Sequence, residues 1–329
     1  MPQRIRMLSG DQVRRLLPMA QAIDEMTNAF TALASNQAEI PERTHLESSD
    51  QKTTVLVMPS QLHDRGLLGL KLISLCDGNH DRGLPMIQAV VLVMDMKTGQ
   101  VRGMMDGASL TAIRTGAVSG LATRYLARED SRVAAIFGAG VQGRTQLEAI
   151  VTARPSIEKA YIFDPDEEAA NCFAQEMSRQ LGLEVTVPSD RLPLHIADVI
   201  CTATPSGKPL FQPEELGEGV HINAVGSYKL SMQEIPEALV ASAKVVVDDT
   251  DACLSETADL ILPIRHGLIT REDIYAQLGE LTTQDLPGRT TAQETTLFKS
   301  VGLAIQDLAA AAAILQAAEV EDVGTVVEI

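Results

Sequence analysis

Short apolar runs alternate with amphipathic stretches along much of the chain, and this rhythm predicts an α/β protein. The run 133–137 is unbroken, which is typical of a strand buried on both faces of a sheet. From 144 to 151 the apolar positions recur at helical spacing, and the next apolar run, 160–163, ends at Asp164. The same rhythm continues as a helix at 165–181, strands at 184–187, 197–203, 219–225 and 243–247, and a long closing helix from 292 to about 318. We expect the acidic tail beyond that helix to be frayed.

The first third of the chain has a different pattern of hydrophobic and polar residues. Residues 9–35 carry an amphipathic helical stripe that Ser9 can cap. Four short strands follow, separated by turn residues, at 53–58, 68–75, 87–94 and 103–105. They predict a largely antiparallel sheet with one covered face, followed by a long helix at 107–127.

The pattern therefore predicts two domains in an α/β chain. A doubly wound α/β domain of the Rossmann kind would span 121–304. An α+β domain with a mainly antiparallel sheet would combine 1–120 with 305–329, because we expect the last helix to return to the N-terminal half.

Three glycines follow the 133–137 strand in G-x-G-x-x-G spacing, at Gly138, Gly140 and Gly143. The first permits a tight turn, the second lets the backbone approach a pyrophosphate, and the third lets the helix pack on the sheet. The helix N-terminus offers N–H groups to phosphates, and Asp164 stands where a carboxylate can bind both ribose hydroxyls. That charge favours NAD over NADP. A glycine turn that binds nothing is the alternative, and FAD is disfavoured because the motif lies in mid-chain.

The composition of the chain excludes some classes of binding partner. The net charge of −17 argues against nucleic acid and anionic membranes, and the mean hydropathy of +0.05 is that of a globular chain. No apolar run suits a secretory signal or a membrane span, so we expect a cytoplasmic protein. The four scattered cysteines predict free, mainly buried thiols, and the histidine spacing indicates no metal site.

Three cations in the first half are candidates for holding an acidic substrate: Arg43, Lys71 and Arg114. Each also has a structural interpretation. Arg43 could be a solvated loop residue, and Arg114 could pair with an acid. Lys71 lies inside an apolar strand, where an edge residue that points to water is favoured over a buried group with a shifted pKa.

The chain resembles the ornithine cyclodeaminase/mu-crystallin family. The resemblance rests on Arg43, Lys71, the glycine motif and three runs, namely L-T-A-I-R-T-G-A at 110–117, I-N-A-V-G at 222–226 and F-K-S-V-G-L-A-I-Q-D at 298–307. It covers essentially the whole chain. It implies that 1–120 with 305–329 form a substrate and dimerisation domain, through which the protein is a homodimer, and that 121–304 form a Rossmann dinucleotide-binding domain that holds NAD(P).

The resemblance also assigns roles to residues. It implies that Arg43, Lys71 and Arg114 hold the carboxylate and reacting group of the substrate, that Lys71 is catalytic, and that Val301 borders the substrate. Beside the three glycines and Asp164, it implies cofactor contacts by Arg114, Thr115, Val141, Gln142, Thr202, Val225 and Ser300.

Two departures bear on the activity. Cyclodeaminase members carry an acid two residues after the glycine of the A-V-G stretch, where this chain has Tyr228, and Met232 stands where they have a lysine. A phenol with a pKa of about 10 is a poor base at neutral pH. We therefore expect an NAD(P)-dependent oxidoreductase acting on CH–NH or CH–NH2 groups. Its substrate would be a small 2-imino or cyclic imino acid, as in ketimine or pyrroline-2-carboxylate reductases, or it would resemble alanine dehydrogenase.

Two alternatives remain beside the reductase. One is an NAD-dependent ornithine cyclodeaminase. The other is a non-catalytic binding protein of the mu-crystallin kind.

Overall fold

The computed structural model describes residues 3–50 and 52–329, which divide into two compact units. Unit 1 comprises Met1–Arg114 and Leu303–Ile329, and unit 2 comprises Thr115–Gly302. The chain passes from unit 1 to unit 2 within one helix, α3 (Gly107–Leu126), which matches the helix expected at 107–127. The divisions thus fall at 114/115 and 302/303, whereas the sequence pattern set them at 120/121 and 304/305.

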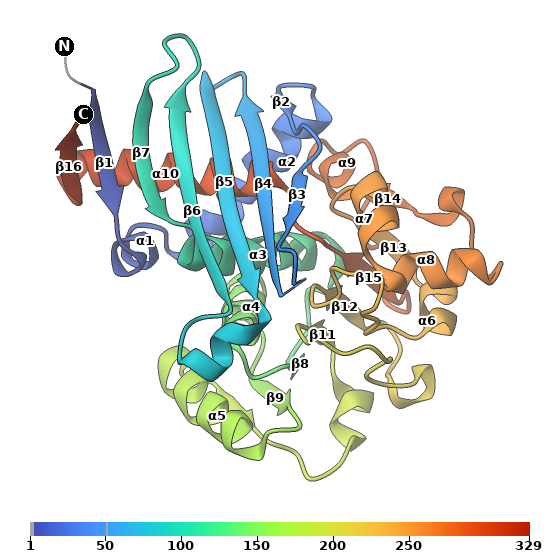
Figure 1. The fold of residues 1–329 in the computed structure, drawn as a ribbon. Coiled ribbons are helices and arrows are strands. Elements are labelled where there is room, and N and C mark those ends of the chain that lie inside the picture. Colours follow the sequence, from blue (N-terminus) through green and yellow to red (C-terminus); the bar gives the residue numbers. More distant parts are fainter. Residues whose placement is uncertain (1–2, 51) are drawn as a thin grey trace. The chain divides into compact units, whose positions relative to one another are not determined.

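Unit 1 is built on a mixed, mainly antiparallel sheet (Figure 1). Its central strands β4 (Thr53–Leu62), β5 (Leu67–Cys76), β6 (Ile87–Asp95) and β7 (Val101–Asp106) are antiparallel neighbours, and they confirm the four predicted strands. The order is β16-β1-β7-β6-β5-β4-β2, with β3 also paired to β4. The outer strands are β1 (Arg4–Leu8), β2 (Ala38–Glu39), β3 (Thr44–Glu47) and β16 (Thr325–Glu328). A 3₁₀ helix, η1 (Asp77–Arg82), joins β5 to β6.

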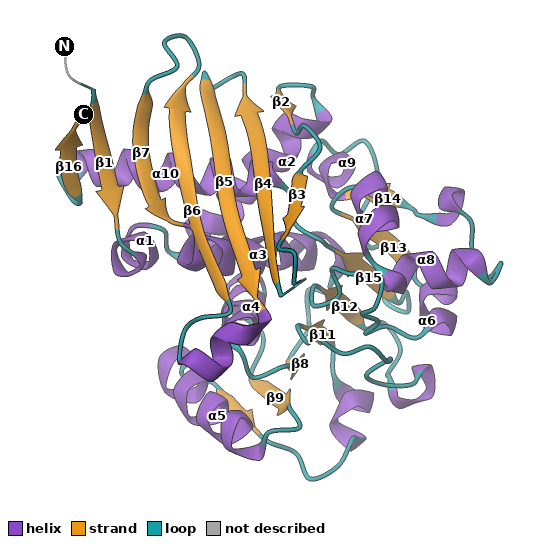
Figure 2. Cartoon of the chain, in the orientation of Figure 1, coloured by secondary structure: helices purple, strands orange, loops and turns teal. Residues whose placement is uncertain are grey.

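The helix α10 (Ala304–Val320) lies across one face of this sheet (Figure 2). It is buried on all sides from Ala304 to Leu315, since α2 (Met19–Ala34) packs on it as well. Glycines in the sheet make the close approach possible. A Cβ at Gly69 would lie 3.0 Å from Leu308, and one at Gly103 would lie 2.9 Å from Leu315. A helix rich in alanine suits this position, because small side chains allow neighbours on every side.

The structure corrects three details predicted for unit 1. Residues 9–35 form two helices, α1 (Gly10–Leu16) and α2, because the chain is extended at Pro18. The acidic tail is not frayed, since β16 pairs antiparallel with β1. The closing helix begins at Ala304 and not at 292, because the stretch before it enters the sheet of unit 2 as β15 (Thr296–Lys299).

Unit 2 contains a parallel sheet in the order β10-β9-β8-β11-β12-β15-β13-β14. The predicted strands are confirmed as β8 (Val133–Phe137), β9 (Lys159–Phe163), β10 (Glu184–Thr186), β11 (Val199–Thr202), β12 (His221–Ala224) and β13 (Lys244–Val247). The short β14 (Ala276–Gln277) was not predicted. Strand order reverses between β8 and β11, as it does in a Rossmann fold. The predicted fold class is thus confirmed.

The helices of unit 2 connect these strands. The helix after the glycines is α4 (Val141–Ala153), and the predicted helix at 165–181 is α5 (Glu167–Leu181). The remaining helices are α6 (Glu237–Ser242), α7 (Thr250–Glu256), α8 (Ala258–Arg265), α9 (Leu278–Thr282), and the 3₁₀ helices η2 (Leu192–Ile196), η3 (Pro213–Glu215) and η4 (Arg271–Asp273).

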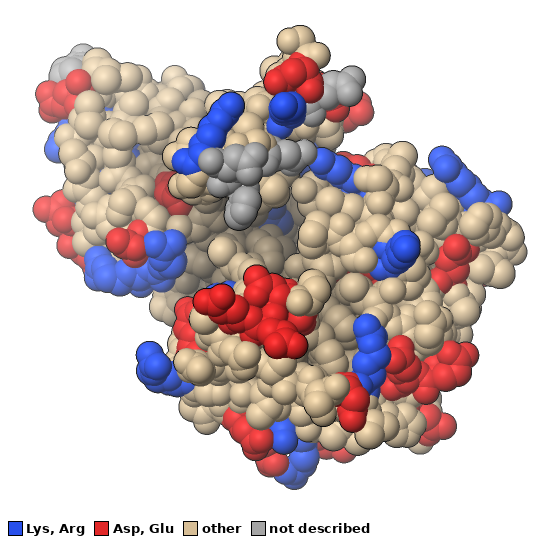
Figure 3. All heavy atoms as spheres, turned by 60° about the horizontal axis from the view of Figure 1, so that its bottom comes forward, with Lys and Arg blue, Asp and Glu red and all other residues tan. Residues whose placement is uncertain are grey.

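On the face drawn in Figure 3, lysine and arginine side chains are scattered among aspartates and glutamates, in keeping with the net charge of −17. In the described part of the chain, no helix has the length and apolar character needed to cross a bilayer. The four cysteines are free, but only Cys201 and Cys253 are buried and Cys172 is exposed, so the expectation of mainly buried thiols holds for half of them.

Candidate active site

Lys71 lies on the covered face of the unit 1 sheet. Its strand, β5, has neighbours on both sides, β4 and β6, so Lys71 is in the interior of the sheet. Only 2% of its surface is exposed. The interpretation of Lys71 as an edge residue pointing to water is therefore wrong. The period-two alternation of β5 explains the burial, because Lys71 shares a face with the buried Gly69 and Ile73.

A single carboxylate joins Lys71 to Arg114. The Nζ atom of Lys71 donates to Oδ2 of Asp307 at 2.6 Å, and Nε of Arg114 donates to Oδ1 at 3.0 Å. Asp307 lies in the first turn of α10, and Arg114 lies on α3. Nη1 of Arg114 also donates to Oε1 of Gln306 at 2.6 Å. The structure thus brings two of the three predicted substrate cations together around one acid within unit 1.

Burial shifts the proton equilibrium of Lys71. Loss of water lowers the pKa of its ammonium to about 8, while the charge of Asp307 opposes this change and the charges of Arg114 and Arg43 add to it. Arg43 is half-buried in the loop between β2 and β3. Its positive charge contributes to the lowered pKa of Lys71. An amine with a pKa near 8 can give or take a proton near neutral pH, which an ordinary lysine cannot.

The glycine loop of unit 2 has the three properties that its spacing predicted. Gly138 has φ +104, and a Cβ there would lie 2.6 Å from the carbonyl oxygen of Ala203. A Cβ on Gly143 would lie 1.9 Å from the carbonyl oxygen of Gly138, so only glycine allows α4 to pack there. A Cβ on Gly140 would meet no atom within 4 Å. The backbone at Gly140 is therefore open to a ligand.

The N-terminus of α4 adds hydrogen-bond donors to this open backbone. Its N-cap is Gly140, which has no side chain to cap the helix, so the first N–H groups are available to an anion. Val141 is 67% exposed at this end. The Oε1 atom of Gln142 is buried and has no hydrogen-bond partner among the residues described. The helix α3 passes close by, because a Cβ on Gly116, next to Thr115, would lie 2.6 Å from the carbonyl oxygen of Thr145 on α4.

Asp164 follows β9 and ties the glycine loop to the next turn. Its Oδ2 atom accepts from the backbone N–H of Ala139 at 2.7 Å, and its Oδ1 atom accepts from that of Asp166 at 2.9 Å. The carboxylate is half-buried beside the loop. It is thus fixed at the end of the strand where the sequence predicted a contact with ribose.

The other predicted cofactor residues end neighbouring strands of the same sheet. Thr202 is the last residue of β11, Val225 follows β12, and Ser300 follows β15. Because these strands are parallel, their carboxyl ends share the edge that also carries the glycine loop. The hydroxyls of Thr202 and Ser300 are buried and donate to the carboxylates of Glu234 and Asp248.

Two buried acids at this edge were missed by sequence reasoning. The carboxylate of Glu234 accepts from the backbone N–H groups of Thr204, Gly226 and Ser227 and from the hydroxyls of Thr202 and Thr204. Burial raises the pKa of Glu234, although the charge of Lys299 opposes the shift.

Asp248 does the same for the segment after β15. Its Oδ2 atom accepts from Oγ of Ser300 at 2.6 Å and from the N–H groups of Val301 and Gly302 at 3.0 and 2.7 Å. Val301, predicted to border substrate, is therefore held by its backbone. Neither acid lies in a motif that would have singled it out, whereas Asp307 closes the 298–307 run and received no role.

Tyr228 and Met232, the two departures from the cyclodeaminase pattern, lie in the loop after β12. The amine of Lys229 lies 5.6 Å from the ring centre of Tyr228. Glu234, the acid bonded to Gly226, is fully buried and accepts five hydrogen bonds, so it does not replace the missing base.

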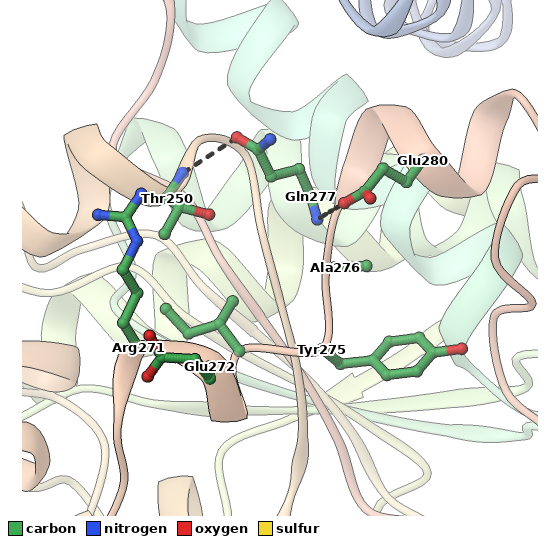
Figure 4. Close-up of a pocket in the computed structure, with 8 residues that line it drawn as sticks. Thr250, Arg271, Glu272, Tyr275, Ala276, Gln277 and Glu280 are labelled. Atoms are coloured by element: carbon green, nitrogen blue, oxygen red, sulfur yellow. Dashed lines mark hydrogen bonds between the residues drawn. The ribbon is translucent and has the colours of Figure 1, made fainter.

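A surface hollow of about 280 Å³ lies between α7 and α9 of unit 2 (Figure 4). Its polar groups already bind one another, since the N–H of Thr250 donates to Oε1 of Gln277 at 3.1 Å and the N–H of Gln277 donates to Oε2 of Glu280 at 2.8 Å. It offers no group with chemistry comparable to that around Asp307. Among the side chains that the structure describes, no three of His, Cys, Asp or Glu are grouped to hold a metal ion.

Replacing Asp307 with asparagine tests the shared carboxylate. We expect the pKa of Lys71 to fall below its value of about 8, because Asp307 is the charge that favours the ammonium. Removing one partner of a buried ion pair also costs about 3–5 kcal/mol of unfolding free energy. NMR titration of 13C-labelled lysine, together with urea unfolding, measures both. Asp248→Asn is the control, because it removes a buried acid from unit 2 and should leave the Lys71 titration unchanged. An unchanged or raised pKa in Asp307→Asn would contradict this account.

Comparisons with known proteins identify the family of the chain. The model of the ornithine cyclodeaminase/mu-crystallin family matches residues 4–321. The chain is 37% identical over 323 residues to a Delta(1)-pyrroline-2-carboxylate reductase of Bacillus cereus, covering 98% of this chain and 99% of the relative.

Two solved structures are similar over nearly the whole chain. The Delta(1)-pyrroline-2-carboxylate reductase of Thermococcus litoralis, in complex with NADH and L-proline, has a TM-score of 0.93 and 40% identity and covers 98% of this chain and 99% of its own. An archaeal alanine dehydrogenase dimer with bound NAD has a TM-score of 0.92 and 33% identity, with 98% and 99% coverage. The chain belongs to the ornithine cyclodeaminase/mu-crystallin family.

Proposed function

We propose that this protein is an NADH-dependent reductase of small 2-imino acids, with a cyclic imino acid such as pyrroline-2-carboxylate as the leading substrate. The observation that carries the proposal is the buried group formed by Lys71, Arg114 and Asp307. Two cations share one carboxylate there, in a chain whose net charge is −17. A small carboxylate would balance the remaining positive charge. The resemblance to pyrroline-2-carboxylate reductases supports the same substrate class.

The glycine loop fits a dinucleotide. The open backbone at Gly140 and the uncapped N-terminus of α4 suit a pyrophosphate, and the carboxylate of Asp164 suits ribose hydroxyls. When bound, NADH supplies the hydride for the reaction. We assign further contacts with the cofactor to Arg114, Thr115, Val141, Gln142, Thr202, Val225 and Ser300.

The residues of unit 1 bind and polarise the substrate. Arg43 and Arg114 hold its carboxylate, and Arg114 is kept in orientation by Asp307 and Gln306. Lys71 keeps the substrate nitrogen protonated, directly or through water, and Val301 borders the substrate. A protonated C=N bond accepts hydride more readily, because positive charge is already on the bond. With a pKa of about 8, Lys71 is mostly an ammonium at pH 7 and can deliver that proton.

Two other functions are weaker. Ornithine cyclodeamination needs a base near Tyr228, and Glu234 is too deeply engaged to serve. A non-catalytic binding protein has no use for a buried lysine whose pKa is shifted toward neutrality. Release of ammonia from ornithine without added cofactor would favour the first. Absence of NADH oxidation with every imine tested would favour the second.

Turnover tests the proposal directly. We expect NADH oxidation with pyrroline-2-carboxylate, piperideine-2-carboxylate, iminosuccinate or pyruvate plus ammonia, with a cyclic imine as the best substrate. Lys71→Met should lower kcat by about 100-fold or more, because general acid catalysis contributes about 10²–10⁴-fold. NADH binding, followed by its fluorescence, should be retained. Equal kcat in the variant would remove Lys71 from the mechanism.

Asp164 should set the preference for NADH. We expect kcat/KM with NADH to exceed that with NADPH by more than tenfold, because a 2′-phosphate would meet the carboxylate. Asp164→Ser should reduce this ratio by about tenfold, equivalent to about 1.4 kcal/mol. Glu168→Ser is the matched control, since it removes an equal charge from the first turn of α5. A wild-type preference for NADPH, or an equal effect of the two variants, would contradict the role of Asp164.

We also propose that the protein is a homodimer formed through the unit 1 sheet. The face of the sheet opposite α10 presents apolar side chains, with Leu72 and Val90 exposed by 45% and 37%. Such a surface is typical of an association site. We expect a dimer in sedimentation velocity, and Leu72→Asp should shift it toward monomer. The control Leu192→Asp changes a leucine that is 76% exposed in unit 2 and should leave the dimer intact. A monomeric wild type would end this proposal.

We place the protein in the cytoplasm, where its four free thiols would stay reduced. Fractionation of the source cells with an antibody against the chain tests this location. Recovery in an extracellular or membrane fraction would contradict it.

A further inference from the structure

Gln306 has a buried hydrogen-bond donor that the interactions around Asp307 leave unused. Its side chain is fully buried, and its Oε1 atom accepts from Nη1 of Arg114 at 2.6 Å. Its Nε2 atom has no hydrogen-bond partner in the described chain. We propose that Gln306 is a specificity-determining residue whose amide N–H donates to the carboxylate of the substrate. This inference rests on the proposed function, because it assigns one more contact to the same substrate.

The orientation of the amide is determined by its neighbour. A guanidinium group only donates hydrogen bonds, so the oxygen of Gln306 must face Arg114. The NH2 group is then directed elsewhere, and the alternative assignment of the amide would set two donors against each other. Leaving a buried donor without an acceptor is costly, so natural proteins rarely contain one without a ligand or water to satisfy it.

The surroundings favour an anion as that acceptor. Lys71 and Arg114 already share Asp307. Gln306 lies in the first turn of the 17-residue helix α10, whose N-cap, Leu303, provides no side-chain hydrogen bond. Helix N-termini favour negative charge. A second unpartnered polar atom, Oγ1 of Thr111, is buried one turn before Arg114 on α3. The hydroxyl of Thr111 and the amide of Gln306 are thus two unused donors near Arg114. They suit a carboxylate, which has two oxygens to accept their hydrogen bonds.

Gln306 could instead serve only to orient Arg114, and two variants separate the roles. Gln306→Glu keeps an oxygen for Arg114 but replaces the N–H donor with a negatively charged oxygen. Gln306→Met removes both functions at similar volume. If Gln306 only orients Arg114, the glutamate variant should behave like wild type and the methionine variant should be impaired. If it donates to substrate, both should be impaired and the glutamate variant should be the worse.

The experiment measures ligand binding and turnover on the full-length protein. Pyrrole-2-carboxylate, a stable planar carboxylate, is titrated calorimetrically into each protein with NADH present, and pyrrole is the matched probe without a carboxylate. We expect Gln306→Glu to weaken pyrrole-2-carboxylate binding by at least 30-fold and Gln306→Met by about tenfold, as loss of a hydrogen bond to a charged group implies. Pyrrole binding and NADH binding should change less than twofold, which also shows that the variants fold.

Turnover gives a second, independent readout. With pyrroline-2-carboxylate as substrate, KM should rise in parallel with the loss of binding, while kcat should change little. Wild-type-like binding in Gln306→Glu would overturn the inference, and so would failure of the wild type to bind pyrrole-2-carboxylate. Wild-type binding that depends on Gln306, without NADH oxidation by any imino acid, would refute the proposed function and leave the carboxylate contact standing.

Discussion

Lys71 and Arg114 are almost fully withdrawn from water, and the carboxylate of Asp307 makes this possible. Removing an ammonium or guanidinium group from water is costly unless an opposite charge is in contact with it. One carboxylate meets two cations here, so the group remains short of negative charge. Burial lowers the pKa of Lys71 to about 8, although the charge of Asp307 opposes the shift. A buried ion pair often contributes no more to stability than well-packed apolar side chains of similar volume would.

Buried carboxylates perform a related task in unit 2, where their partners are mainly backbone N–H groups. Glu234 holds the turns after β11 and β12, and Asp248 holds the turn after β15. Asp259 extends this arrangement, since it accepts from the N–H of Glu234 and pairs with the fully buried Lys299 at 3.0 Å. These acids occupy the donors that would otherwise compete for an anion, whereas the N-terminus of α4 keeps its donors open. These hydrogen bonds tie the turns after β11, β12 and β15 to buried carboxylates.

The elements of the fold were largely predictable because their hydrophobic periods are regular. The strands β4 to β7 and the β8–α4–β9 unit follow from alternation, glycine spacing and helical intervals. The errors occur where a tertiary contact outweighs the local pattern. Residues 296–299 lie in an apolar, helix-compatible stretch, yet they fill the gap between β12 and β13. The last residues are acidic, but β1 offers an edge with which they pair.

Sequence reasoning singled out the cations, the glycines and Asp164 of the candidate site, but it gave no role to Asp307 and did not single out Glu234. Lys71 and Arg114 are conspicuous because cations are rare in apolar or small-residue surroundings, whereas Arg43 follows a proline turn. Asp307 and Glu234 are less conspicuous, because acids are common throughout this chain and sequence alone does not reveal which are buried. The interior position of Lys71 was also misjudged, because sequence alone does not reveal which strands lie beside β5. Its neighbours along the strand are compatible with an edge, and only the pairing with β4 and β6 on either side excludes one.

The path of the chain through unit 1 has a consequence for biosynthesis. The sheet strands β1 to β7 are made first, but α10, which covers their inner face, is encoded after the whole of unit 2. A nascent chain on the ribosome can therefore complete the parallel sheet around residues 133–299 while the earlier strands still lack their covering helix. Strand β16 can join β1 only after residues 325–328 have been synthesised, so the sheet of unit 1 is completed only after all the strands of unit 2 have been made.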